Sequence, residues 1–265
     1  MANSFFQALS YLRYWLRSGT AHGLHSPFVF GLYTTVICHD GQFRAYPLVE
    51  ARRQALLASP QVLDVCDFGA GSRVVGAGTR RRAVRDIARH AAKPPRLAQL
   101  LFRLVNHFQP ATVLELGTSL GLTTAYLALA DSRAQVITFE GCPATAGVAR
   151  ETFAELGLAN VELVAGNLDE TLPATLGALG QPLDFVFFDG NHRYEPTLRY
   201  FEQCLANAHE NSVFVLDDIH WSAEMEQAWE AIKAHPAATV TVDLFYVGLV
   251  FFRKKQPRQD FWLRY

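Results

Sequence analysis

From Ala111 onward, short apolar segments alternate with segments of helix length, and this alternation constrains the fold more than any other feature of the sequence. The apolar segments are ATVLELG, AQVITFE, NVELVAG, LDFVFFD and NSVFVLD. They are almost continuously apolar, which is typical of parallel strands that are buried on both faces. Strands that alternate with helices indicate βαβ units around a mostly parallel sheet.

The segment TVTVDLFYVGLVFFRK contains two β-rich runs around a short turn with Gly248, which predicts an antiparallel hairpin. Five parallel strands and this hairpin predict an α/β fold with a Rossmann-like sheet of seven strands. An ordinary dinucleotide-binding domain does not need the hairpin, so the pattern disfavours that form of the sheet.

The sequence before this region predicts mainly helices. We expect them at Phe5 to Leu16, Pro27 to Val36, Leu48 to Leu57 and Pro95 to Phe108. We place a domain boundary near Pro110. Residues 1–109 then form a helical N-terminal extension that caps the substrate site, and residues 110–265 form the cofactor-binding domain.

A glycine turn, Glu115-Leu-Gly-Thr-Ser-Leu-Gly121, follows the first predicted strand of this region. Its glycines allow the backbone to approach a ligand, and the next helix offers N–H groups at its positive end. The following strand ends at Glu140, whose carboxylate can accept hydrogen bonds from both hydroxyls of a ribose. Gly166 and Asn167 end the third strand, where Asn167 either contacts an adenine edge or caps the next helix.

A second glycine turn, Asp67-Phe-Gly-Ala-Gly-Ser72, lacks a following strand that ends in an acid. We interpret it as a turn of the extension, either a cover for the substrate pocket or a solvated loop. The basic run from Arg73 to Arg96 is interpreted as a helix with solvated arginines. The alternative is a phosphate-binding patch for RNA, but the run contains no aromatic residue for base stacking.

Two other predicted strands end in acids, one at Asp189 and one at Asp217, which Asp218 follows. The carboxyl ends of parallel strands line one crevice, so these acids are expected to converge there. A cation would relieve their mutual repulsion, and oxygen ligands suit Mg²⁺ or Ca²⁺. The alternative is that Asp218 caps the next helix and Asp189 orders its own loop.

His192 lies in the polar loop after Asp189, where a group that titrates near neutral pH can accept a proton from a hydroxyl substrate. The alternative is a structural histidine. His220 and Trp221, just beyond the second acid pair, are candidates for the wall of the substrate site.

The segments VLELGTSLGLTTAYLALA, VITFEGCP, LDFVFFDGNHRY and VFVLDD resemble successive motifs of the catechol-type and caffeoyl-CoA-type O-methyltransferases, over Ala111 to Lys233. The resemblance implies a class I methyltransferase that uses S-adenosylmethionine. Over the whole chain, with its His22 to Phe28 segment and the DFGAGS turn, the sequence resembles uncharacterised bacterial class I methyltransferases, which implies a fold and a cofactor but no substrate.

By this resemblance, one group of residues surrounds the methionine part of the cofactor and Glu140 holds its ribose. That group is Glu115, Gly117, Thr118, Ser119, Gly121 and Thr123. Asp189, Asp217 and Asp218 occupy metal-ligand positions, and Asp218 stands where the family usually has asparagine. His192 stands where the family has a catalytic lysine.

Composition sets the remaining expectations. The 24 basic and 25 acidic residues nearly cancel, so no overall charge favours nucleic acid or a membrane surface. Four scattered cysteines form no metal or disulfide pattern and favour the cytoplasm. We expect a small-molecule substrate and leave a homodimer open. The alternatives are a methyltransferase of RNA or another macromolecule, a non-catalytic S-adenosylmethionine-binding module and, least favoured, a nicotinamide dehydrogenase.

Overall fold

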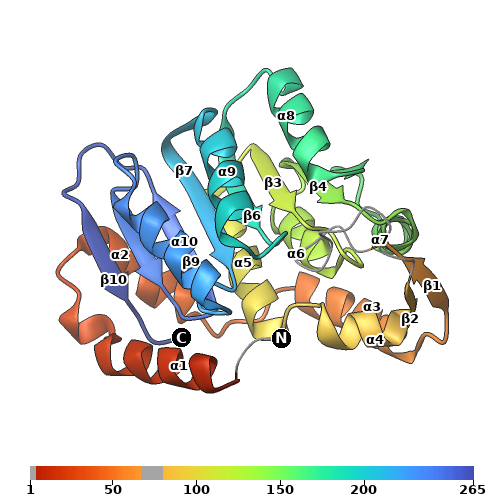
Figure 1. The fold of residues 1–265 in the computed structure, drawn as a ribbon, viewed down its shortest axis with the longest axis horizontal. Coiled ribbons are helices and arrows are strands. Elements are labelled where there is room, and N and C mark those ends of the chain that lie inside the picture. The colour runs from red at the N-terminus through yellow and green to blue at the C-terminus, as the bar shows by residue number, and fades with distance from the viewer. Residues whose placement is uncertain (1–3, 67–79) are drawn as a thin grey trace. The chain divides into compact units, whose positions relative to one another are not determined.

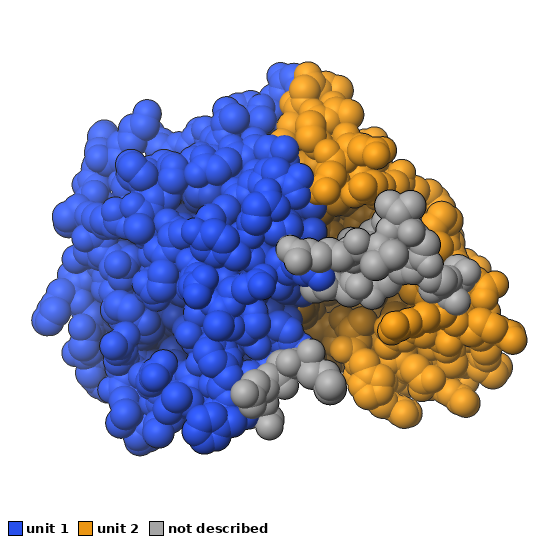
Figure 2. Space-filling model, in the orientation of Figure 1, with its two compact units in different colours: residues 1–39, 179–265 blue, residues 40–178 orange. Residues whose placement is uncertain are grey.

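A computed structural model of the chain describes residues 4–66 and 80–265. The chain forms two compact units, which Figure 2 colours separately. Unit 1 consists of residues 1–39 and 179–265, and unit 2 of residues 40–178. These limits follow packing and do not coincide with the boundary expected near Pro110, which stays a prediction. The turn from Asp67 to Ser72 and the start of the basic run at Arg73 lie outside the described residues.

Unit 2 contains a parallel sheet whose strands follow one another in sequence (Figure 1). Its strands are β3 (Thr112–Leu116), β4 (Gln135–Glu140) and β5 (Val161–Ala165). In register, Leu114 lies opposite Ile137 and Glu140 opposite Ala165. The carboxyl ends of all three strands therefore lie at one edge of the sheet.

The helices of unit 2 build its hydrophobic core. They are α3 (Ala45–Ala58), α4 (Val84–His90), α5 (Pro95–Phe108), α6 (Leu122–Ala130), α7 (Pro143–Glu155) and α8 (Leu168–Ala178). Tyr46, Phe102 and Tyr126 pack their rings together, with centroids 5.3 Å apart for the first pair and 5.8 Å for Tyr46 and Tyr126. The Tyr126 hydroxyl donates a 2.9 Å hydrogen bond to Glu50, so this polar group is satisfied at the margin of the core.

A short antiparallel ribbon of β1 (Val62–Val65) and β2 (Arg80–Ala83) also belongs to unit 2. The ribbon corrects part of the interpretation of the basic run, because Arg80 to Arg82 lie in a strand, whereas Arg85 and Arg89 lie in the helix α4 as expected. Their side chains are exposed, so the expected solvation is correct. Three consecutive arginines give no pattern of apolar residues from which a strand could be predicted. Their strand conformation comes from pairing with Val62–Val65.

Unit 1 contains five strands in the order β10-β8-β9-β7-β6. They are β6 (Leu183–Phe188), β7 (Ala208–Asp217), β8 (Val240–Asp243), β9 (Val247–Phe251) and β10 (Gln259–Trp262). Strands β6 and β7 are parallel, and β8 and β9 form the expected antiparallel hairpin. Strand β10 was not expected, and it pairs in parallel with β8. The described residues thus supply eight strands besides the ribbon, and the expected number of seven is wrong by one.

The helical elements of unit 1 come from both parts of its sequence. They are α1 (Ser4–Arg17), the 3₁₀ helix η1 (Ala21–Gly23), α2 (Pro27–Leu32), the π-helical segment η2 (Tyr33–Ile37), α9 (Tyr194–Leu205) and α10 (Ala223–Ala234). The Tyr14 hydroxyl of α1 donates to the Leu263 carbonyl, and the Tyr33 hydroxyl donates to the Arg264 carbonyl at 2.8 Å. These bonds attach the first helices to residues that follow β10, as the neighbouring ribbons in Figure 1 show.

The four helices expected before Pro110 are confirmed, with ends within a few residues of those predicted. Among the described residues, no helix combines the length and the apolar character that crossing a membrane requires.

Candidate functional site

The turn between β3 and α6 has three residues in the left-handed region of the backbone. Gly117 has φ 112°, Ser119 has φ 51° and Gly121 has φ 80°. The N–H groups of Gly117 and Thr118 donate to the Phe139 carbonyl on β4, at 3.2 and 2.9 Å. The turn is therefore fixed against the neighbouring strand, as a preorganised binding loop requires.

Glu140, at the end of β4, forms hydrogen bonds with this turn. One carboxylate oxygen accepts from the Ser119 N–H at 2.8 Å and the other accepts from the Cys142 N–H at 2.9 Å. Burial raises the pKa of Glu140 above its ordinary value, while the N–H groups of Cys142 and Ser119 lower it in part. The structure thus brings the predicted ribose acid and the glycine turn together.

Glu115 and Thr118 lie inside unit 2. Glu115 is fully buried, and its Oε2 accepts from the hydroxyls of Thr124 and Thr138, the latter at 2.6 Å. Thr118 and Thr138 share a further 2.6 Å hydrogen bond. This network joins β3, β4 and α6 beneath the turn, and Thr123, on the first turn of α6, is 8 % exposed. Contact of these residues with a methionine group stays a prediction.

Gly121 and Gly166, the two remaining glycines of the predicted site, combine a positive φ with a close contact at the position of a Cβ. A Cβ on Gly121 would lie 2.6 Å from Cε1 of Phe153, and a Cβ on Gly166, which has φ 138°, would lie 3.0 Å from the Thr171 methyl group. Asn167 caps α8, because its side-chain oxygen accepts from the Asp169 N–H at 3.1 Å. The capping alternative for Asn167 is observed, and its adenine contact stays a prediction.

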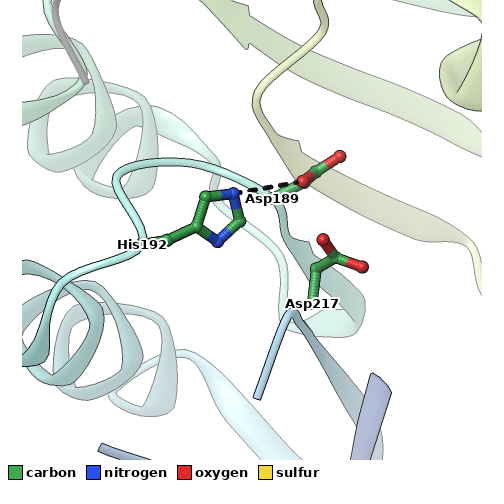
Figure 3. A group of neighbouring side chains, drawn as sticks. All are labelled: Asp189, His192 and Asp217. Carbon is green, nitrogen blue, oxygen red and sulfur yellow. Dashed lines mark ion pairs between the residues drawn. The ribbon is translucent and has the colours of Figure 1, made fainter. Parts of the chain in front are cut away.

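In unit 1, three side chains meet where β6 and β7 end. Asp189 follows β6, Asp217 ends β7 and His192 lies in the loop before α9 (Figure 3). Each contributes one potential ligand atom, and these atoms all lie within 4.8 Å of one another. His192 Nε2 lies 3.6 Å from Asp189 Oδ1, beyond direct hydrogen-bond distance, and Asp217 is 1 % exposed. The predicted convergence is confirmed for Asp189 and Asp217, and His192 completes the group.

The backbone conformation of the loop places His192 in this group. Asn191 has φ 53°, its carbonyl accepts from the Arg193 N–H at 2.6 Å, and its side-chain amide donates to the Tyr200 hydroxyl at 3.4 Å. A non-glycine residue in this conformation is uncommon and often marks a functional turn.

Asp218 is not a member of the group that meets within 4.8 Å. It has φ 53°, its N–H donates to the Tyr246 carbonyl at 2.7 Å, and it lines a separate cavity with His220 and Trp221. The alternative that it caps the next helix is wrong, because Ser222 caps α10 by accepting from the Met225 N–H at 3.2 Å.

His220 forms a partly buried cluster with two acids that the sequence did not predict. Its Nδ1 lies 2.9 Å from Glu226 Oε1 and its Nε2 lies 2.8 Å from Asp243 Oδ2. Burial lowers the pKa of His220, but Asp243 and Glu226 outweigh burial and raise it above its ordinary value. Asp243 comes from β8, and no spacing rule connects it to His220.

Comparisons with known proteins relate the chain to methyltransferases. Residues 114–219 match the family model described as a methyltransferase domain. A catechol O-methyltransferase from Niastella koreensis is 28 % identical over 127 residues, which cover 47 % of this chain and 57 % of that protein. The match thus spans little more than half of the relative's length.

Solved structures show the same fold. Cofactor-bound Rv0187 from MTB has a TM-score of 0.57 and 22 % identity, covering 86 % of this chain and 96 % of that one. The O-methyltransferase from Bacillus cereus in complex with SAH has a TM-score of 0.56 and 18 % identity, covering 84 % and 96 %. Residues 114–219 of the chain thus match a methyltransferase domain model, and the chain has the fold of these solved methyltransferases.

Proposed function

We propose that the protein transfers a methyl group from S-adenosylmethionine to a hydroxyl oxygen of a small molecule. This proposal rests mainly on the hydrogen bond from the Ser119 N–H to the Glu140 carboxylate. The bond brings a carboxylate that can accept from ribose hydroxyls next to a glycine turn, where two adjacent strands end. Support also comes from the matched methyltransferase domain and from solved relatives that hold SAM or SAH.

The residues of unit 2 fit this cofactor. The Glu140 carboxylate keeps lone pairs for ribose hydroxyls beyond its two backbone bonds. The backbone of Gly117 to Gly121 would hold the methionine part, and the region of Gly166 and Asn167 would hold the adenine. When bound, the cofactor supplies an electrophilic methyl group. The chain's own task is to orient the acceptor oxygen and to remove its proton.

We assign His192 as the group that accepts this proton. Its imidazole faces two carboxylates, Asp189 and Asp217, which stabilise the charged imidazolium that forms. Asp189 Oδ1 lies 3.6 Å from Nε2, within ion-pair distance of the imidazole once it is protonated.

The same three side chains offer a donor set for a divalent cation. Two carboxylates suit Mg²⁺, Ca²⁺ or Mn²⁺, whereas an imidazole in the set favours a transition metal over Mg²⁺ or Ca²⁺. A bound cation would stabilise the acceptor oxygen as an anion. In that arrangement His192 binds the metal and cannot also accept the proton. Whether methyl transfer depends on added metal distinguishes these two roles.

The deciding experiment follows methyl transfer from labelled S-adenosylmethionine to a library of small hydroxyl compounds, alone and with Mg²⁺ or Mn²⁺. His192→Ala should lower turnover about 10²- to 10⁴-fold, and the exposed His25→Ala variant serves as the matched control. Calorimetry with S-adenosylmethionine tests the cofactor itself. No binding would refute the proposal, and binding without any transfer would favour the non-catalytic module.

Transfer to RNA remains the second candidate, and its supporting observation is the exposed row of Arg80, Arg81 and Arg82 on β2. RNA retention that falls steeply with salt, and that disappears when these arginines are replaced, would support it.

A further inference from the structure

A cavity of about 390 Å³ lies within unit 1, where α1 faces the segments that follow β7 and β8. Its volume falls in the range of roughly 300–1,000 Å³ that small-molecule sites occupy. The residues that matter for its chemistry are Tyr11, Asp218, His220, Trp221, Phe245 and Tyr246. The cavity is thus lined by four aromatic rings, one imidazole and one carboxylate.

The rings around Phe245 stand nearly perpendicular to it. The Tyr11 ring lies 4.9 Å from the Phe245 ring at 87°, and the Tyr246 ring lies 5.0 Å from it at 86°. His220 stacks on Phe245 at 5.1 Å and 14°. Trp221 is 46 % exposed and adds a further aromatic surface. Phe245 is 8 % exposed and supports the other rings, whereas Tyr11 and Tyr246 are 47 % and 51 % exposed and, with Trp221, offer electron-rich faces to an organic cation.

The charges at the cavity are predominantly negative. Among the described lining residues, His220 is the only group able to carry a positive charge. Its two nitrogens form hydrogen bonds with the carboxylates of Glu226 and Asp243. The two negative charges of these carboxylates outnumber the one positive charge of a protonated imidazole. Asp218 adds another carboxylate at the wall. The local charge is negative in either protonation state of His220, which favours a cationic ligand.

Two residues of the cavity wall have uncommon backbone conformations. Phe245 has φ 70° and Asp218 has φ 53°, and both are bulkier than the glycine that such angles favour. The Phe245 N–H donates to Asp243 Oδ1 at 2.9 Å. On the opposite side, the Gln7 side chain of α1 donates to the Trp221 carbonyl at 3.4 Å. Strain of this kind persists where the surrounding structure fixes it, and it often occurs at ligand sites.

We propose that this cavity binds an organic ammonium cation, with the aromatic rings enclosing the head group and Asp218 pairing with its charge. This binding does not depend on the proposed function, because His192 does not line the cavity.

The test is calorimetry on the full chain, without cofactor, using choline and its uncharged isostere 3,3-dimethyl-1-butanol. The two probes differ in charge and hardly in shape, so choline should bind at least about 10-fold more tightly. Asp218→Asn and Trp221→Ala should each weaken choline binding by roughly 10-fold. Phe30→Ala is the matched control, because Phe30 is also 46 % exposed but does not line the cavity.

Equal affinity for the two probes, or no choline binding by folded protein, would overturn the proposal. Circular dichroism of each variant confirms folding, and because Trp221 and Phe30 are both half-exposed, neither change removes a core side chain. If choline binds but no methyl transfer is found, the cation site stands and the proposed reaction fails. If transfer is found with neutral acceptors and choline does not bind, the reaction stands and the cation site fails.

Discussion

Replacing Gly121 by alanine tests whether the turn depends on a missing side chain. Two effects oppose the new methyl group. Gly121 has φ 80°, where a Cβ costs about 1–2 kcal/mol. The added Cβ would also lie 2.6 Å from Cε1 of Phe153 and 3.3 Å from Cα of Ala149. Overpacking of a tight contact costs about 1–3 kcal/mol. We therefore expect the free energy of unfolding to fall by about 2–5 kcal/mol.

The assay is urea unfolding followed by far-ultraviolet circular dichroism. Gly147→Ala is the matched control, because this α7 glycine has no atom within 4 Å of the added Cβ. Alanine in a helix interior should stabilise the protein by about 0.5–1 kcal/mol. Phe153→Leu removes the clashing ring atoms, so the double variant should be more stable than the sum of the two single changes implies. A Gly121→Ala protein within about 0.5 kcal/mol of the unmodified chain would refute the reasoning.

Three further predictions concern charged groups. The raised pKa of Glu140 means that its contribution to stability is greatest below pH 4.5, its ordinary value, and declines as the pH rises through its folded-state value. The urea midpoint of Glu140→Gln, measured against pH, should lack this decline. A pH profile identical to that of the unmodified chain would contradict the prediction. Asp243→Asn should cost about 3–5 kcal/mol of unfolding free energy, because the 2 % exposed carboxylate accepts hydrogen bonds from Trp229 and Phe245 and pairs with His220. Exposed Asp64→Asn is the control, and equal loss in both variants would argue against the cluster. Mn²⁺ should raise the melting temperature of the unmodified chain more than Mg²⁺ does, and His192→Ala should remove the difference. A difference that survives in His192→Ala would exclude the imidazole as a ligand.

Much of the sheet could be predicted because its strands are buried on both faces. Continuous apolar runs such as LDFVFF leave few alternatives, and each strand end then places the next residue at one edge. The same rule predicted that Asp189 and Asp217 meet. Strand β10, with the sequence QDFW, lacked such a run and is defined by its pairing with β8.

The finer arrangement of the site depended on contacts between residues remote in sequence. Neighbouring positions suggested that Asp217 and Asp218 act together, but the positive φ of Asp218 directs it to a different cavity. The Ser222 hydroxyl accepts a hydrogen bond from the Met225 N–H at the start of α10, so Asp218 is not needed as the cap of this helix. His220 meets Asp243 only because the hairpin returns to β7, and no local pattern encodes that contact.

The hydrogen bonds from Tyr14 and Tyr33 to Leu263 and Arg264 also bear on the order of events during synthesis. Unit 2 is continuous in sequence, so its contacts can form while the chain is still growing. The first helices, in contrast, must wait until more than two hundred later residues have left the ribosome. During that interval the side chains of α1 that are buried in the folded unit, such as Tyr14, are available to chaperones. A ribosome stalled just before residue 263 should therefore present a folded middle segment with an unfolded beginning.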